Sequence, residues 1–185
     1  MTADLPVILD VDPLVSWFES RGEHLTIAEI EAAGALVGRN SFPALVINLH
    51  LSCLLPDEVF AHGLVSAWQM AEFPTIAMPP DEWSWLFDDV GFTRDGIKTT
   101  RPTEPVTLYR GAVPEHARGW SWTEDVDLAR WFANRFPGTG ARLYRTTVRP
   151  PWLMAHITPE WKFGRHGESE WVVDPSGPHV IEEVR

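Results

Sequence analysis

The sequence predicts an α+β protein, and a change in the spacing of its apolar residues carries this prediction. Up to about residue 100 apolar side chains recur at the three- and four-residue spacing of helices, whereas beyond residue 105 they alternate with polar ones as in strands. The turn-rich stretch TRDGIKTTRPTEP separates the two patterns. We therefore expect a mainly helical N-terminal region over residues 1–100 and a β-rich core over residues 101–185, and the two can form one compact domain.

Three segments of the first region carry helix signals. TIAEIEAAGALVG begins with the capping box of Thr26 and Glu29 and ends at Gly38. PDEVFAHGLVSAWQM and PPDEWSWLFDDVG both begin with proline and two acidic residues, as helix N-termini prefer. The stretch FPALVINLHLSCLLP between them is ambiguous, because its polar residues alternate as in a strand while its length and its proline favour a buried helix. We expect a helix there.

The second region contains five segments with strand-like alternation and one helix. The strands are expected at residues 106–111, 141–148, 151–157, 168–174 and 179–184. The segment EDVDLARWFANRF has helical spacing and is terminated by Pro137 and Gly138. This region is thus mainly β with one strong helix.

Composition excludes several classes of function. The 185 residues carry a formal charge of -11 and no run of Lys and Arg, so nucleic acid is not an expected partner. The N-terminus lacks a basic segment typical of signal peptides, and no apolar run reaches the roughly 18 residues of a membrane span. We therefore expect a cytoplasmic protein with no membrane partner.

The motifs of several enzyme classes and metal sites are also missing from the sequence. The single Cys53 cannot form an intrachain disulfide, and its apolar surroundings favour a buried thiol over a nucleophile. The seven histidines show no metal-ligand spacing, so no metal is expected. Neither a phosphate-binding GxxxxGK[ST] loop nor a GxSxG nucleophile motif occurs.

Two acidic residues interrupt a segment that otherwise reads as a buried strand, RHGESEWVVDP. On a strand Glu168 and Glu170 point to the same face, with their carbons roughly 6 to 7 Å apart. Like charges at that distance repel each other unless water screens them or a cation lies nearby. Either this face is solvated, or something positive or reactive occupies it.

Two further polar features precede this pair in the chain. Arg110 closes the strand VTLYRG, and Ser121 with Thr123 stands just before the helix in GWSWTED. Taken alone, an arginine at a strand end is a surface ion-pair partner, and a Ser-x-Thr before a helix is a turn or a cap.

In chain order, LYRG, GWSWTED and GESEW resemble the arginine, serine and glutamate signature of the ADP-ribosyltransferase family. The resemblance covers about residues 104–175. It implies a core of two packed, mostly antiparallel β-sheets with NAD in the cleft between them, preceded here by the helical region. It also implies mono-ADP-ribosylation of a protein acceptor, with arginine as the modified residue and with release of nicotinamide.

The residues of the signature have separate expected roles. A guanidinium suits the pyrophosphate of NAD, so Arg110 is expected to bind it, and Gly111 lets the backbone approach the nicotinamide amide. Cleavage of the nicotinamide–ribose bond develops positive charge, which Glu170 would stabilise while it holds the ribose 2′-hydroxyl. Glu168 would orient or deprotonate the acceptor.

The serine motif departs from the usual Ser-Thr-Ser at its second and third positions. Ser121 is expected to orient Glu170 and the ribose, and Thr123 to support the strand end. The middle residue is Trp122, which by alternation should point away from the cleft and pack into the core.

Two other functions stay open: an NAD glycohydrolase with water as the acceptor, and a binding module that keeps the fold without turnover.

Overall fold

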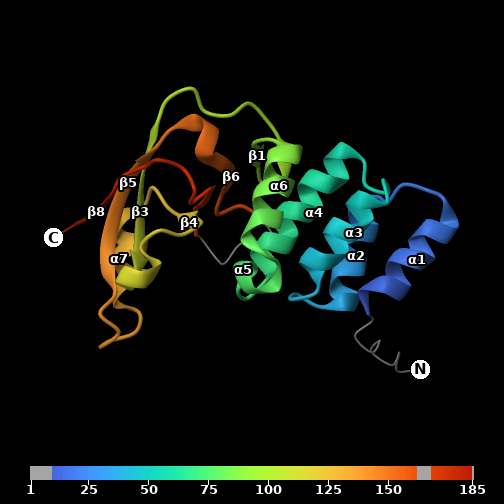
Figure 1. Ribbon diagram of the computed structural model, residues 1–185, viewed down its shortest axis with the longest axis horizontal. Coiled ribbons are helices and arrows are strands. Elements are labelled where there is room, and N and C mark those ends of the chain that lie inside the picture. Colours follow the sequence, from blue (N-terminus) through green and yellow to red (C-terminus); the bar gives the residue numbers. More distant parts are fainter. Residues whose placement is uncertain (1–9, 162–167, 185) are drawn as a thin grey trace. The chain divides into compact units, whose positions relative to one another are not determined.

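The computed structural model of the chain describes residues 10–161 and 168–184. Helices dominate its first half and strands its second half, which confirms the α+β class (Figure 1). The chain divides into two compact units, one comprising residues up to Val90 together with Gly96–Lys98, and the other comprising Gly91–Asp95 and Thr99 onward. Among the described residues, no helix combines the length and the apolar character needed to cross a membrane.

The first unit is built from helices that pack around α4. Its elements are α1 (Val11–Arg21), α2 (Ile27–Val37), α3 (Phe42–Leu51), α4 (Asp57–Met70), α5 (Pro74–Ala77), α6 (Pro80–Val90) and the short β2 (Ile97–Lys98). All three helices predicted from capping signals are present, and the ambiguous stretch forms the helix α3, as expected. Every residue of α4 from Val59 to Trp68 is buried, so this helix is covered on all sides, as apolar helices in a protein core are.

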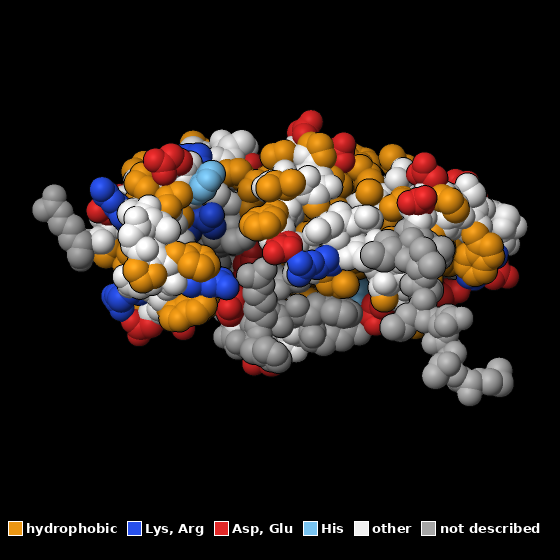
Figure 2. Space-filling view, turned by 90° about the horizontal axis from the view of Figure 1, so that it is seen from below, with side chains coloured by type: hydrophobic (Ala, Val, Ile, Leu, Met, Phe, Trp, Pro, Cys, Tyr) orange, Lys and Arg blue, Asp and Glu red, His pale blue; other side chains and the backbone are white. Residues whose placement is uncertain are grey.

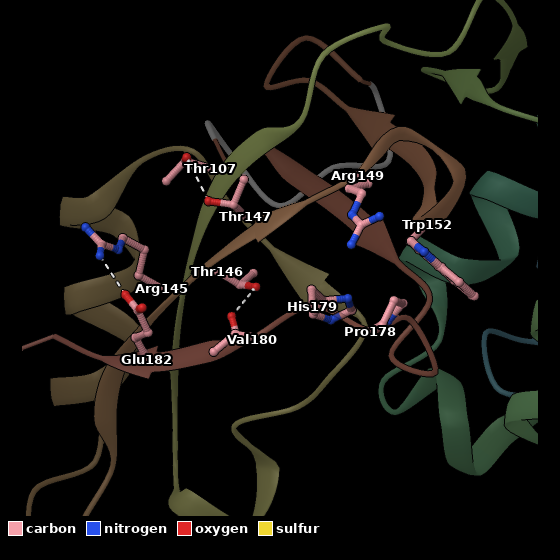
Figure 3. Close-up of a pocket in the computed structure, with 10 residues that line it drawn as sticks. All are labelled: Thr107, Arg145, Thr146, Thr147, Arg149, Trp152, Pro178, His179, Val180 and Glu182. Carbon is pink, nitrogen blue, oxygen red and sulfur yellow. Dashed lines mark hydrogen bonds and ion pairs between the residues drawn. The ribbon is translucent and has the colours of Figure 1, made fainter.

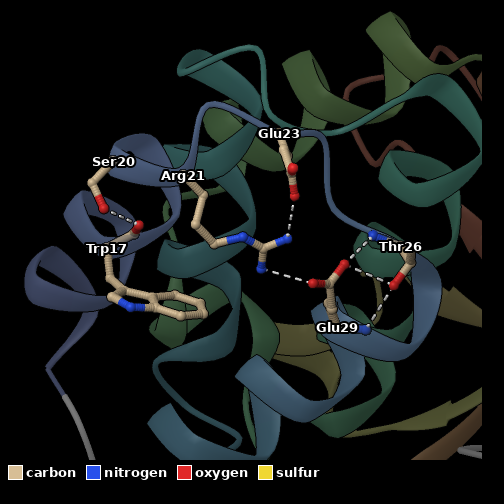
Figure 4. A network of polar contacts seen from close by, with 6 residues as sticks. All are labelled: Trp17, Ser20, Arg21, Glu23, Thr26 and Glu29. Atoms are coloured by element: carbon tan, nitrogen blue, oxygen red, sulfur yellow. Dashed lines mark hydrogen bonds and ion pairs between the residues drawn. The ribbon is translucent and has the colours of Figure 1, made fainter.

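The start of α2 is held by a network of polar contacts (Figure 4). The Thr26 hydroxyl accepts a hydrogen bond from the backbone N–H of Glu29, and the Glu29 carboxylate accepts one from the backbone N–H of Thr26. Arg21, at the end of α1, donates to the same carboxylate at 2.7 Å. These bonds, led by the one from the Thr26 backbone, lower the pKa of Glu29 to about 2.

The prediction that Cys53 is buried is wrong. The residue is exposed and its φ of 55° lies in the left-handed region. Helix α3 ends at Leu51, and the N–H of Cys53 turns back to the carbonyl of His50. This turn directs Cys53 to the surface while Leu54 enters the core. The sequence did not predict this exposure, because the residues around Cys53 are mostly apolar and no proline or glycine marks the residue where α3 ends.

The second unit contains most of the strands. Its elements are β1 (Thr93–Arg94), β3 (Val106–Ala112), the 3-10 helix η1 (Pro114–His116), β4 (Ser121–Trp122), α7 (Val126–Asn134), β5 (Arg142–Val148), the 3-10 helix η2 (Pro150–Trp152), β6 (Leu153–Ile157), β7 (Glu170–Val173) and β8 (Ile181–Glu183). The five strands predicted in this region and its one helix are all found, although β5 begins one residue later than expected and β6, β7 and β8 are shorter than expected.

The strands form two sheets with the orders β2-β1-β6-β7-β4 and β3-β5-β8. The pairs β3–β5, β5–β8, β4–β7 and β6–β7 are antiparallel, and β1 pairs with β6 in parallel. One apolar cluster contains side chains of both sheets, namely Phe92, Leu108, Trp122, Tyr144, Val148, Leu153, Trp171 and Val173. Trp122 is only 2% exposed in this cluster, so the prediction that it packs into the core is confirmed.

Candidate functional site

Ser121 and Glu170 lie on neighbouring strands and share one face of their sheet. In the antiparallel pair of β4 and β7, Ser121 is opposite Val172 and Trp122 is opposite Trp171. Opposed residues point to the same side, and so do residues two apart on one strand. Ser121 and Glu170 are therefore diagonal neighbours, at a separation of about 7–8 Å between their α-carbons.

A single backbone bridge brings β3 beside this strand pair. The N–H of Tyr109 donates to the carbonyl of Thr123 at 2.7 Å, and the N–H of Thr123 donates to the carbonyl of Tyr109 at 2.9 Å. The bridge ties the edge of the three-stranded sheet to the residue that follows β4. It places Arg110, the next residue of β3, beside the strand that carries Ser121.

The guanidinium of Arg110 is held by backbone carbonyls. One terminal nitrogen donates to the carbonyl of Ser121 at 2.6 Å, and Nε donates to the carbonyl of His116 at 3.1 Å. Gly119 lies against the same group, since a β-carbon at that position would be 2.7 Å from Cζ of Arg110. The absence of a side chain at Gly119 is therefore what lets the chain close over the guanidinium.

Burial and the charge of Glu170 act on Arg110 in opposite directions. Burial lowers the pKa of the Arg110 guanidinium, and the nearby negative charge of Glu170 opposes that change. Arginine remains charged at neutral pH even so. Of the two alternatives left open for the paired carboxylates, screening by water or a nearby cation, the charge of Arg110 supplies the cation for Glu170.

The second carboxylate of the pair, Glu168, lies outside the strand. Because β7 begins at Glu170, the strand predicted for residues 168–174 is too long at its start. The alternation that was expected to aim both glutamates at one face therefore does not apply to Glu168. Its side chain is partly buried, as is that of Glu170.

Side chains on the opposite face of β7 fix the residues on both sides of Glu170. The ring of His156 stacks on Trp171 with 4.2 Å between centroids and 8° between planes, and its Nε2 lies 3.1 Å from the Ser169 hydroxyl. The indole N–H of Trp171 donates to Glu124 at 3.0 Å. Burial, followed by the charge of Arg94, lowers the pKa of His156, so the ring is neutral at pH 7.

Sequence reasoning missed His156, Glu124 and the capping role of Asp125. His156 pairs with Trp171 only through the register of β6 and β7, which no short pattern in the sequence reports. The carboxylate of Asp125 accepts hydrogen bonds from the N–H groups of Asp127 and Leu128, so this residue is the N-cap of α7. The sequence could have predicted this role, because Asp125 directly precedes the residues with helical spacing.

The hydroxyl of Thr123 serves the chain locally. It accepts a hydrogen bond from the N–H of Asp125 at 3.1 Å, and the residue is 6% exposed. Thr123 therefore joins the end of β4 to the start of α7.

Gly111 has a structural reason to be glycine. A β-carbon there would lie 2.2 Å from the carbonyl oxygen of Ala129 and 2.3 Å from the nitrogen of Ala133, because the backbone of α7 lies directly against β3 (Figure 1). From the sequence we expected this glycine to allow the close approach of a ligand; in the structure the packing of α7 is by itself a sufficient reason for a glycine here. Its N–H and C=O still point to the edge of β3 that Tyr109 uses, because residues two apart bond in the same direction.

Within residues 10–161 and 168–184 there is no group of three or more His, Cys, Asp or Glu side chains that could hold a metal ion. Comparison of the chain with models of known protein families, with curated proteins and with solved structures finds no match.

Proposed function

We propose that the protein is an NAD-dependent mono-ADP-ribosyltransferase that modifies arginine on a protein acceptor and releases nicotinamide. The observation that carries this proposal is the position of Arg110, which donates to the strand of Ser121 and experiences the charge of Glu170. Residues of the three parts of the family signature, in its chain order, are thus brought together in the second unit, and this supports the proposal. Residues that form an ion pair only to stabilise the fold would not need to follow the order of a family signature.

The site offers suitable groups for NAD. A guanidinium carries five N–H groups, and the bonds to Ser121 and His116 use two of them, which leaves three for the pyrophosphate or the ribose. The N–H and C=O of Gly111, at the open edge of β3, match the acceptor and donor of a primary carboxamide such as that of nicotinamide. Arg110 and Gly111 are adjacent, as are the parts of a folded NAD that they would bind.

Glu170 would act on the bond between nicotinamide and ribose. As this bond breaks, its electron pair leaves with the nicotinamide nitrogen and positive charge develops on the ribose carbon and ring oxygen. A fixed carboxylate beside the ribose stabilises that charge and accepts a hydrogen bond from the 2′-hydroxyl. The flanking contacts of Ser169 and Trp171 with His156 keep Glu170 in place for this task.

Glu168 would act on the acceptor. A guanidinium nitrogen of the target attacks the ribose carbon, the new C–N bond forms, and one proton must leave that nitrogen. Glu168, two residues before Glu170, is the group that takes this proton in our proposal. Its place outside the strand suits contact with an incoming side chain.

The test measures nicotinamide release from NAD and transfer of labelled ADP-ribose to protein in the presence of arginine-rich polypeptides or cell lysates. Glu170→Gln should lower both at least about a hundredfold, because a neutral amide no longer stabilises the developing charge. Glu168→Gln should abolish transfer and keep slow hydrolysis of NAD.

Other results assign the open alternatives. Nicotinamide release without any transfer by the wild type would identify a glycohydrolase. If the wild type releases no nicotinamide under any of these conditions while NAD still binds, the enzyme hypothesis is wrong and the chain is a binding module.

A further inference from the structure

The second unit contains a pocket that is separate from the Arg110 site. Its volume is about 530 Å³, within the range of roughly 300–1,000 Å³ typical of small-molecule sites. The pocket lies along β5 and the segment that leads into β8 (Figure 3), and its polar wall includes Thr107, Arg145, Thr147, Arg149 and His179. Arg110, Ser121 and Glu170 do not belong to the part of its wall that the structure describes.

The charge of this wall is positive. Arg145 pairs with Glu182 at 2.6 Å, so these two charges balance. Arg149 has no ion pair or hydrogen bond from its side chain to the described part of the chain and contributes one unmatched positive charge. Figure 2 shows Lys and Arg side chains, with Asp and Glu side chains among them, on the part of the second unit that carries β3, β5 and β8. In a chain with a net charge of -11, such a pocket attracts small anions locally.

The wall also offers neutral hydrogen-bonding groups. The hydroxyls of Thr107 and Thr147, on neighbouring strands, are hydrogen-bonded to each other at 3.3 Å, and both residues line the pocket. His179 is 7% exposed, and neither ring nitrogen has a hydrogen-bond partner in the described residues. Buried polar groups usually have hydrogen-bond partners. After a small rotation of the ring, a polar ligand in the pocket could supply the partner that His179 lacks among the described residues.

The loop before β8 is held firmly enough to shape this wall. Arg118 donates to the carbonyls of Pro175, Gly177 and His179 at 2.8 to 3.0 Å. Gly177 lies against the indole of Trp152, since a β-carbon there would be 2.7 Å from the ring. The half-buried indole of Trp152, with Pro178 and Val180, forms the apolar part of the pocket wall.

This combination of groups favours a phosphate over a carboxylate. A guanidinium, two hydroxyls and a neutral imidazole present more donors than the two oxygens of a carboxylate can use, whereas a phosphate monoester has three terminal oxygens. The remaining volume and the indole suit an organic ring attached to the phosphate. We propose that this pocket binds a nucleoside monophosphate, with the phosphate on Arg149 and the hydroxyls and the base near Trp152.

The experiment titrates adenosine 5′-monophosphate into the full chain, followed by calorimetry and by the NMR signals of the Trp152 indole and the His179 ring. The wild type should bind it, and adenosine alone should bind at least about tenfold more weakly. Arg149→Gln should weaken binding of the monophosphate about tenfold to a hundredfold, the effect of losing a charge-assisted hydrogen bond.

The control is Arg142→Gln, which removes one positive charge from the start of β5, the strand that Arg149 directly follows; Arg142 pairs with Glu183 and is not among the residues that line the pocket. It should leave the affinity within about twofold. Equal weakening by the two variants would show that only net charge matters and would overturn the proposal. So would equal binding of adenosine, no binding at all, or binding that shifts signals around Arg110 and is insensitive to Arg149→Gln. None of these outcomes depends on the activity proposed for Glu170.

Discussion

In each unit an arginine experiences the charge of a glutamate, and Arg21 with Glu29 differs from Arg110 with Glu170 in what surrounds the charge. Arg21 and Glu29 meet at the surface, where direct bonds raise the pKa of the arginine and lower that of the glutamate. Burial lowers the pKa of Arg110, whose guanidinium donates to the backbone carbonyls of His116 and Ser121, while the charge of Glu170 opposes this change. Arg21 and Glu29 thus stabilise each other's charge, and the capping bonds from Thr26 further stabilise the carboxylate of Glu29.

The difference separates a pair that supports the fold from a pair that our proposal places in a functional site. The Arg21 pair is screened by water and joins two helix ends, a contact of small energetic value. A guanidinium kept charged against burial is costly, and such strained electrostatics concentrate at functional sites. The following predictions test this comparison, from the largest expected effect to the smallest.

Replacing Arg110 by lysine should have the largest effect. A lysine ammonium cannot bond to the carbonyls of Ser121 and His116 with the planar geometry of a guanidinium. We therefore expect the free energy of unfolding to fall by about 2–4 kcal/mol. We expect the rate of nicotinamide release to fall at least about a hundredfold. Urea unfolding and NAD cleavage measure the two effects. Arg21→Lys is the matched control, and an equal loss of stability there would refute the distinction between the pairs.

Gly119→Ala should affect the site more than the fold. The added methyl would lie 2.7 Å from the guanidinium carbon of Arg110, which must then move away from the Ser121 carbonyl. We expect about a tenfold loss of NAD cleavage, because misplacing a binding group by about 1 Å can cost up to a hundredfold. Thermal unfolding of the same variant measures the fold. Normal activity in this variant would mean that the position of Arg110 does not matter.

His156→Gln should reduce activity moderately. The glutamine can keep the bond to the Ser169 hydroxyl but loses the ring stacked on Trp171, so the strand around Glu170 is held less firmly. We expect a fall in the turnover of NAD of about threefold to tenfold and a loss of about 1 kcal/mol of stability. A change in stability with unaltered turnover at every pH would show that His156 only supports the fold.

Acidification should produce the smallest effect, through Glu29. Its pKa is about 2 in the folded protein and 4.5 in the ordinary case, so its contribution to stability is fully present above pH 4.5 and is lost as the pH falls towards 2. Screening by water limits this contribution to no more than about 1 kcal/mol. Unfolding of the wild type and Glu29→Gln between pH 2 and 6 should converge at the acid end. A constant difference across this range would contradict the linkage.

The sequence predicted local elements well and the partners of site residues poorly. Thr26 and Glu29 form the predicted capping box because both bonds lie within one turn of helix. Cys53 was misjudged because its exposure depends on where α3 stops, and Glu168 because strand β7 starts two residues later than the alternation suggested.

The sequence by itself determined the α+β class, the capped helices, the strands β3 and β5, and the inward direction of Trp122. Hydrophobic spacing and capping act over a few residues and are therefore visible in one dimension. Only the tertiary structure decided that Arg110 bonds to the strand of Ser121, that Gly111 makes room for α7, and that His156 lies on Trp171. These contacts depend on strand register and on bridges between residues 11 or more positions apart in the chain, for which no local pattern exists.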